Sequence, residues 1–468
     1  MERKTVVKFG GSNLQKPEDF QKLVKVVRNY NKPIVIVVSA FCGVTDKLTK
    51  TMTDDVNSTQ NIKLICNDLA NIHKQIIFHN ISNSEASKNT FSEVDSLITE
   101  LESILNIFCK YGRSNIELKD LILTFGERFT ATILNAILIN YKIDSELIFP
   151  ENLGLITDGR FGNSRINFNL SDEKVTKKLS SEKTFVIPGF YGISEKNQVT
   201  TFGRGGSDYT AASIAKIINA SSLDFWKDVD GLQSADPKIV TNPTQVTHLN
   251  YAEASELAYF GAKILHPLSI EPIAEKNIPV KIFNINKVQE NNLPETIINK
   301  DNCLTKTIKS ITYSNDFGII KLEGSEIGYK AGILSLITSC LNIAEINIKS
   351  VITSQTTINL LLSKNDLKSA GLILQNNQIE TVSSIKIIDD ISTIAVIGNG
   401  IYENYENASR IFSAITKSKI NIRLISFGAT DSSAYFIINE QDKNLAVKAI
   451  HAEIFETKNA EFYNTNSL

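Results

Sequence analysis

Short apolar runs that alternate with helical stripes constrain the fold of this chain more than any other feature. Near-continuous apolar runs are typical of buried parallel strands. We expect such strands at 6–9, 34–38, 185–187, 223–226 and 280–283. Between them apolar residues recur every three or four positions, for example along 62–76 and 91–105, which indicates helices with one buried face. The alternation predicts an α/β domain with helices on both faces of a mainly parallel sheet.

Beyond residue 300 a different pattern occurs twice: a strand, a helix, a strand that opens on Ile-Asn-Ile and a basic residue, another strand and a helix. The tetrapeptide lies at 346–349 and again at 420–423. This order predicts a duplicated ferredoxin-like module. We expect domains at 1–290, 311–390 and 391–468, with a connector at 291–310 and with the two modules free to interleave.

Composition excludes several classes of function. The chain has 49 Lys and Arg against 51 Asp and Glu, a net charge of -2, and so lacks the basic excess that nucleic-acid binding requires. Its five cysteines and five histidines are scattered outside metal-ligand spacings, which predicts no protein-built metal site and a reducing compartment. The longest apolar run, 33–42, is too short for a bilayer, and no signal peptide is expected at the start. We therefore expect a cytoplasmic protein without a membrane partner.

The segment Thr200–Ala212, TTFGRGGSDYTAA, is the most informative motif. Gly205 and Gly206 precede a helical run, where backbone amides and the helix dipole favour an anion. Arg204 adds a planar fork for a carboxylate or phosphate, and Asp208 supplies the opposite charge. A site with both signs suits an amino acid, whereas the alternative is a glycine turn that caps a helix beside a surface ion pair.

A second glycine turn, Gly10-Gly11-Ser12, follows Lys8 where the first strand ends and a helix is expected to open. Glycine amides, a helix N-terminus and a lysine charge together predict a phosphate cradle, although the order differs from that of a Walker A loop. The alternative is a tight turn with an exposed lysine. By contrast, Gly398-Asn399-Gly400 lacks the third glycine of a dinucleotide fingerprint, and we interpret it as a turn within the repeat.

Other candidate residues have weaker local signals. Ser39 and Thr45 follow the second strand and could bind a carboxylate, or serve as loop and helix-cap hydroxyls. Glu127 lies in a helical run, where a solvated or paired glutamate is the more frequent outcome. The acidic turn 226–238 follows another strand, and Lys263 lies on an apolar helical face from which a lysine extends to solvent unless it meets an anion.

Taken together, the motifs resemble those of aspartokinases. In chain order they are KFGGS, VVSAFCGVTDKL, FGERF, PGFYG, TTFGRGGSDYTAA, WKDVDGLQSADP, ELAYFGAKILHP and IPVKIFN. The resemblance spans essentially all of the chain. It implies an amino-acid-kinase domain followed by two ACT domains, and phosphoryl transfer from MgATP to L-aspartate, the first step towards lysine, threonine, methionine and diaminopimelate. The rival interpretations are another amino-acid kinase, such as a glutamate or acetylglutamate kinase, and a weakly catalytic amino-acid sensor.

The resemblance also implies roles for individual residues. Lys8 and the Gly10-Gly11-Ser12 turn would hold the transferring phosphoryl group, and Asp208 would align the lysines and bind substrate or Mg²⁺-linked water. The substrate-binding set would be Arg204 for the α-carboxylate, Glu127 for the ammonium, and Ser39, Thr45 and Ser207 for positioning. The nucleotide set would be Lys227, Asp228, Gln233, Lys238 and Lys263.

Two departures from the family pattern matter. Lys227, Gln233 and Lys238 replace the usual Thr, Tyr and Arg of the nucleotide loop, which bears on nucleotide affinity, and Ser12 for Thr is a mild change. In the first ACT domain the implied effector residues are Lys330, Lys349, Thr353, Ser354 and Gln355. Because Lys349 and Gln355 stand where lysine-sensitive relatives carry acidic residues, we expect weak lysine binding, with threonine or no effector preferred. Paired ACT domains predict a homodimer or a larger homo-oligomer.

Overall fold

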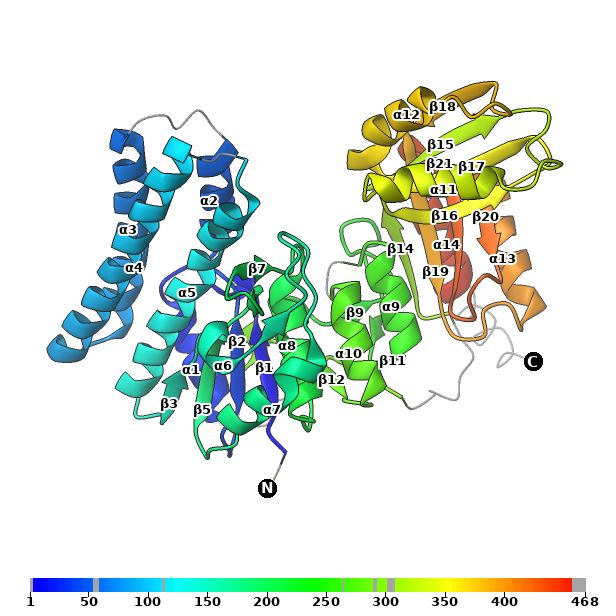
Figure 1. Ribbon diagram of the computed structural model, residues 1–468. Helices are drawn as coiled ribbons and strands as arrows, with labels where there is room; N and C mark the ends of the chain where they lie inside the picture. The colour runs from blue at the N-terminus through cyan, green and yellow to red at the C-terminus, as the bar shows by residue number, and fades with distance from the viewer. Residues whose placement is uncertain are drawn as a thin grey trace, which may run out of the picture. The chain divides into compact units, whose positions relative to one another are not determined.

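The computed structural model describes residues 3–53, 59–111, 114–262, 265–288, 293–300 and 308–456. The chain divides into two compact units (Figure 1). The N-terminal unit comprises Met1–Leu232, Gln245–Ala258 and Lys263–Cys303. The C-terminal unit comprises Gln233–Thr244, Tyr259–Ala262 and Leu304–Leu468. The chain therefore passes between the units more than once.

An eight-stranded sheet forms the core of the N-terminal unit. Its order is β11-β13-β12-β8-β1-β2-β5-β3, and its neighbours run parallel except for the antiparallel pair β12–β13. The strands are β1 (Val6–Phe9), β2 (Val35–Val38), β3 (Ser145–Leu147), β5 (Thr184–Pro188), β8 (Leu223–Lys227), β11 (His248–Asn250), β12 (Val280–Asn284) and β13 (Thr296–Asn299). All five strands that the apolar runs predicted are present, and β1 and β2 are buried along their whole length, as parallel strands covered on both faces are.

Strand β13 lies within residues 291–310, where the sequence predicted a connector. Its Thr296 explains why this polar-flanked stretch joins the sheet. The Thr296 hydroxyl donates to the Val246 carbonyl and accepts from the Leu232 amide, while Ile298 is fully buried against the core. A smaller ladder of the same unit consists of β4 (Ile156–Thr157), β6 (Tyr191–Ser194) and β7 (Val199–Thr201). A further two-stranded ladder consists of β9 (Leu232–Gln233) and β10 (Gln245–Val246).

Helices cover the sheet and extend beyond it. They are α1 (Asp19–Arg28), α2 (Val44–Thr53), α3 (Thr59–Asn80), α4 (Ser84–Tyr111), α5 (Ile116–Asn140), α6 (Pro150–Leu153), α7 (Phe168–Lys178), α8 (Gly206–Ile217), α9 (Tyr251–Tyr259) and α10 (Ile270–Glu275). The two predicted stripes lie on α3 and α4, which form an antiparallel pair beside α5 (Figure 1). Among the described residues α5 alone is long and apolar enough to cross a membrane, but 78% of its apolar window is buried in the protein. It is the central helix of this unit's core.

The C-terminal unit holds the predicted repeat. The first module contains β15 (Phe317–Glu323), α11 (Ile333–Ile343), β16 (Ile348–Thr353), β17 (Thr357–Ser363), α12 (Leu367–Asn376) and β18 (Ser384–Ile388), with sheet order β16-β17-β15-β18. The second contains β14 (Ser310–Ser314), β19 (Ile391–Ile397), α13 (Tyr405–Lys417), β20 (Ile422–Phe427), β21 (Ser433–Asn439) and α14 (Lys443–His451), with order β14-β19-β21-β20. Both have the β-α-β-β-α connectivity of a ferredoxin-like module.

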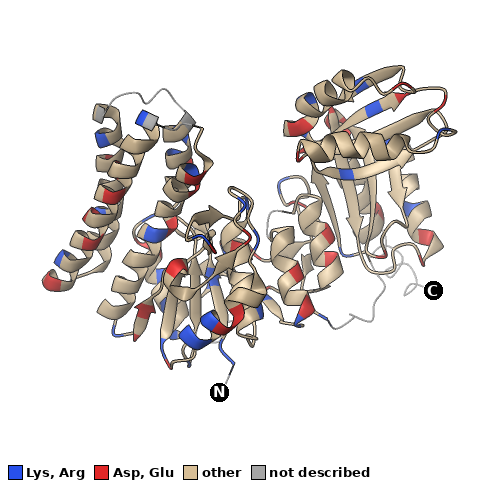
Figure 2. Ribbon diagram, viewed as in Figure 1, with Lys and Arg blue, Asp and Glu red and all other residues tan. Residues whose placement is uncertain are grey.

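The two modules are interleaved. Strand β14 precedes the first module in the chain, yet it pairs antiparallel with β19 of the second, from Ser310 opposite Ile397 to Ser314 opposite Thr393. Its Ile311 is buried in the same hydrophobic cluster as Ile394. Acidic and basic residues are interspersed along the helices of both units (Figure 2).

Candidate active site

The carboxyl ends of the central parallel strands converge on one region of the N-terminal unit. Strand β1 lies between β2 on one side and β8 on the other, so strands that come later in the chain lie on both sides of it. Ligands of open α/β sheets bind outside the carboxyl ends of strands at such a switch point. Lys8 lies in β1, Ser39 follows β2, and Lys227 ends β8.

A cluster of three charges, of which Lys8 and Asp208 are buried and Lys227 is partly buried, occupies this point. Lys8 Nζ lies 2.5 Å from Asp208 Oδ1, and Lys227 Nζ lies 3.7 Å from Asp208 Oδ2. Burial alone would raise the pKa of Asp208, but Lys227 and Lys8 outweigh it and the pKa of Asp208 is lowered. Burial, with the Lys8 charge in addition, lowers the pKa of Lys227 despite the opposing effect of Asp208. With one carboxylate between two ammonium groups, the cluster retains an excess positive charge that favours an incoming anion.

The Asp208 carboxylate is placed by the first turn of α8. Gly205, the N-cap of this helix, has φ of 74°, and a Cβ atom there would lie 2.2 Å from His266 Cγ. Only glycine meets both demands. The N-terminus of α8 follows at Gly206, with the positive end of the helix dipole at this point, where the sequence motif predicted a helix start.

A cavity of about 450 Å³ opens beside this helix start. Its lining contains six residues that the sequence predicted: Lys8, Ser39, Thr45, Arg204, Ser207 and Asp208. It also contains Asp120, Phe190 and Thr201, which sequence reasoning missed. Asp120 could have been found from its spacing, because it precedes Glu127 by seven residues and so shares its face of α5. The structure thus gathers side chains of both charge signs around one small cavity.

Glu127 lies at the edge of this group, buried with 4% of its surface exposed. Ser207 Oγ donates to its Oε1 at 3.4 Å, whereas its Oε2 has no hydrogen-bond partner among the described residues. Burial raises the pKa of Glu127 to about 8, against the lowering effects of the Ala40 amide, Ser207 and Lys8. A buried carboxyl with a free oxygen is suited to a cationic ligand group.

The loop after β1 differs in one respect from its prediction. Gly11–Asn13 forms a three-residue 3-10 helix, and the first α-helix begins only at Asp19. Two side chains explain the delay. Asn13 Nδ2 donates to the Trp226 carbonyl at 2.5 Å, which fixes the loop to β8, and Asp19 Oδ2 accepts from the amides of residues 15 and 16. Gly10, Gly11 and the exposed Ser12 therefore form a tight turn after β1, at the carboxyl ends of the neighbouring strands β1 and β8.

The predicted nucleotide residues are distributed between the two units. Lys227 ends β8 in the N-terminal unit, and the exposed Asp228 follows it. Gln233 and Lys238 belong to Gln233–Thr244 of the C-terminal unit, where Ser310 Oγ donates to the Gln233 carbonyl at 2.7 Å. Lys263 lies outside the described residues.

The predicted effector residues lie around the β16 strand. Lys349 is held by Tyr259, whose hydroxyl donates to the Lys349 carbonyl at 3.0 Å and whose ring lies 5.4 Å from the Lys349 ammonium. Lys330 Nζ pairs with Glu380 Oε2 at 2.9 Å. Gln355 Nε2 donates to the Tyr329 hydroxyl at 2.6 Å, and Thr353 and Ser354 are exposed. The lysines of this region thus already have partners.

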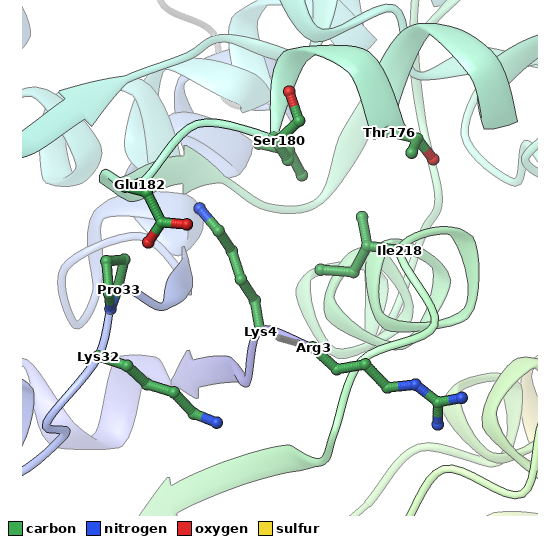
Figure 3. Close-up of a pocket in the computed structure, with 9 residues that line it drawn as sticks. Arg3, Lys4, Lys32, Pro33, Thr176, Ser180, Glu182 and Ile218 are labelled. Carbon is green, nitrogen blue, oxygen red and sulfur yellow. The ribbon is translucent and has the colours of Figure 1, made fainter. Parts of the chain in front are cut away.

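A second cavity of about 200 Å³ lies at the opposite edge of the main sheet. It is lined by Arg3 and Lys4 ahead of β1, Lys32 ahead of β2 and Glu182 ahead of β5. Figure 3 shows Lys4 extended towards Glu182, and the Lys4 ammonium also donates to the carbonyls of residues 181 and 183. Lys4 therefore helps to join the amino ends of the strands, and the cavity at the carboxyl ends is the better candidate for an active site.

Comparison with known proteins agrees with this geometry. The profile of the Amino acid kinase family matches residues 3–284, and an ACT domain profile matches residues 394–454. Aspartokinase 3, chloroplastic, of Arabidopsis thaliana is 30% identical over 97% of this chain and 82% of its own length. The chain belongs to the aspartokinase family. It is an ATP-dependent kinase, and its N-terminal unit has the amino-acid-kinase fold with ACT modules after it.

Two further comparisons define the extent of the similarity. The bifunctional aspartokinase/homoserine dehydrogenase of Buchnera aphidicola is 28% identical over 97% of this aspartokinase chain, but the chain spans only 57% of that protein. The structure of E. coli aspartokinase III in complex with aspartate and ADP covers 97% of this chain and all of its own, with a TM-score of 0.85 at 22% identity. This likeness concerns the fold of the whole chain.

Proposed function

We propose that the 450 Å³ cavity is the site at which this aspartokinase transfers the γ-phosphoryl group of MgATP to the side-chain carboxylate of L-aspartate. The products are 4-phospho-L-aspartate and ADP, at the first step of the biosynthesis of lysine, threonine and methionine. The observation that carries the assignment is the Lys8–Asp208–Lys227 cluster beside Arg204. The E. coli aspartokinase III of similar fold is described in complex with aspartate and ADP.

Aspartate is held by its two α-substituents. The exposed Arg204 fork pairs with the α-carboxylate, and the free Oε2 of Glu127 accepts from the ammonium. Ser39, Thr45 and Ser207 donate to the remaining oxygens. This arrangement directs the β-carboxylate towards Lys8.

The transfer needs no general base. An oxygen of the β-carboxylate, already anionic at neutral pH, forms a bond to the γ-phosphorus while the bond from that phosphorus to the bridging oxygen of ADP breaks. No proton is moved, and the main barrier is the approach of anions, which fixed positive charge lowers. Lys8 and the amides of Gly10 and Gly11 supply that charge, and Asp208 holds the two lysines apart and in place.

Magnesium is proposed to enter with the nucleotide. Among the described residues there is no group of three His, Cys, Asp or Glu side chains that could hold a metal. Mg²⁺ typically binds substrate phosphates with one or two carboxylates and several waters, and Asp208 is the carboxylate available for such a water-mediated contact. The bound ion would neutralise phosphate charge.

The proposed nucleotide contacts, effector and assembly rest on the resemblance to aspartokinases. Lys227 and Asp228 line the nucleotide side, with Gln233, Lys238 and Lys263 as the further proposed contacts. The ACT modules bind lysine weakly or not at all, with threonine or no effector preferred, because Lys349 presents a like charge to the lysine ε-ammonium. The ACT modules also mediate assembly into a homodimer or larger homo-oligomer.

A coupled assay of ADP release tests the proposed function. The full chain is incubated with MgATP and L-aspartate, L-glutamate or no amino acid. Turnover dependent on aspartate, with glutamate near the background, is the expected result. Turnover with glutamate at a comparable kcat/KM would assign the chain to another amino-acid kinase, and ADP release equal in all three incubations would refute the assignment.

A further inference from the structure

Asp120 is a buried carboxylate that the reaction itself does not use. It lies on α5 with 2% of its surface exposed. Its Oδ2 accepts from the Thr201 amide at 2.7 Å and from the Gly162 amide at 2.8 Å, and its Oδ1 accepts from the Thr201 hydroxyl at 3.0 Å. Three hydrogen bonds to one buried carboxylate are strong, because the acceptor is charged. They join α5 to two segments distant in the chain.

Both of those segments support the Arg204 loop, which is the stretch 202–205 between β7 and α8. Thr201 ends β7 and is three residues ahead of Arg204. Gly203 lies between them with φ of 73°, and a Cβ atom there would lie 2.8 Å from the Gly162 carbonyl oxygen. The Arg204 loop therefore begins directly after Thr201 and packs against Gly162, and Asp120 accepts hydrogen bonds from both of these residues.

Helix α5 also carries Glu127, seven residues further along. Seven residues are about two helical turns and about 10 Å of rise, so the two carboxylates share one face of the helix. Asp120 and Ser207 line the same cavity, and Ser207 in turn contacts Glu127. One rigid helix thus bears the proposed ammonium partner directly and holds the α-carboxylate partner through Asp120.

We infer that Asp120 is a positioning residue that sets Arg204 relative to Glu127, so that both engage the same aspartate molecule. This inference rests on the proposed function, in which Arg204 binds the α-carboxylate. Without the Asp120 carboxylate, Thr201 ahead of Arg204 loses two of its hydrogen bonds to α5 and Gly162 loses one, and the contact of Arg204 with aspartate is weakened. Binding of ATP, which uses other residues, is unaffected.

Asp120→Asn is the direct test, because it keeps the side-chain size while removing the negative charge. Its single oxygen can still accept from the Thr201 and Gly162 amides, but these become weaker, neutral hydrogen bonds, and its NH2 group faces the Thr201 hydroxyl. Thr201→Val is the milder second variant, since it removes only the hydroxyl bond and leaves both amides bonded to Asp120. Asp224→Asn is the matched control: Asp224 is a carboxylate in the same unit, 3% exposed, bonded by the Tyr30 hydroxyl at 2.7 Å. It is not among the residues that line the cavity.

Steady-state kinetics of the full chain give the decisive numbers. We expect Asp120→Asn to raise the aspartate KM by about tenfold or more and to change the ATP KM by less than about twofold. Thr201→Val shifts the aspartate KM in the same direction but less, and Asp224→Asn leaves both KM values as they are. In an Arg204→Lys background, Asp120→Asn adds less than about twofold, because the two changes disable the same contact.

Several results would overturn the inference. These are a parallel rise of both KM values, a loss of kcat alone, or full additivity with Arg204→Lys. If Asp120→Asn does not fold, an unchanged aspartate KM in Thr201→Val is sufficient to reject it. Arg204→Lys by itself distinguishes a failure of the proposed function from a failure of the Asp120 inference. If that variant leaves the aspartate KM unchanged, the proposed function and this inference both fail; if it raises the aspartate KM while Asp120→Asn does not, only this inference fails.

Discussion

The pH dependence of Glu127 offers the sharpest prediction. Its pKa is raised from 4.5 to about 8 by burial, so between these values the folded state binds a proton that the unfolded state has released. Stability must then fall as the pH rises through this window. At about 1.4 kcal/mol per pKa unit, the free energy of unfolding is lower than at a pH well below 4.5 by roughly 1 kcal/mol at pH 5 and by roughly 4–5 kcal/mol at pH 8.5.

Glu127→Gln removes the titrating group. The amide itself costs about 1–3 kcal/mol if its NH2 group replaces the unpartnered Oε2, but this cost does not vary with pH. Between pH 5 and pH 8.5 the free energy of unfolding of the variant therefore rises by roughly 3–4 kcal/mol relative to that of the wild type. For a unit of this size that corresponds to roughly 7 °C in the thermal midpoint of the N-terminal unit.

The assay is thermal unfolding of both proteins without ligand at pH 5, 6.5, 7.5 and 8.5. Glu195→Gln, a change at an exposed glutamate of the same unit, is the control and should follow the wild type at every pH. Thermal midpoints of Glu127→Gln and wild type that run parallel across this range would refute the burial argument.

The same variant tests the role of Glu127 in binding. Aspartate brings an ammonium that needs an ionised partner, so the wild-type aspartate KM should fall as the pH rises from 6.5 to 8.5. In Glu127→Gln the aspartate KM should be raised about tenfold or more and should lose this pH dependence. An unchanged KM would remove Glu127 from the substrate site even if the stability prediction holds.

Three further predictions concern the other assigned residues. Lys8→Ala and Asp208→Ala should each lower kcat by about a hundredfold or more with the fold retained by circular dichroism; near-normal turnover in either would show that the phosphoryl site is misplaced. Arg204→Lys should raise the aspartate KM far more than the ATP KM, because the planar fork is lost; the opposite ranking would move Arg204 to the nucleotide side. In isothermal titration of the full chain with lysine, threonine and methionine, lysine should bind weakly or not at all, and sub-millimolar lysine binding coupled to inhibition would contradict the Lys349 argument.

Local sequence patterns were sufficient for the central strands and for several of the residues that line the cavity. Burial imposes a period on apolar residues, so the five strands β1, β2, β5, β8 and β12 and the stripes of α3 and α4 could be predicted without tertiary information. The glycine turns at 10–11 and 205–206 could be predicted for the same kind of reason, since a backbone that must approach a ligand closely needs glycine. Parallel strands end at one edge of the sheet, which brought Lys8, Ser39 and Lys227 to one region.

Other features were decided only by the tertiary structure. Chain order placed 311–390 in the first module and could not show which strand β14 pairs with, so its place beside β19 depends on long-range packing of residues such as Ile311. The pKa of Glu127 depends on burial by segments far from it in the chain. The bonds from Asp120 to Thr201 and Gly162 likewise join residues dozens of positions apart. The sequence alone thus determined which residues have the chemistry, and the tertiary structure decided their distances and burial, on which the electrostatic energies depend.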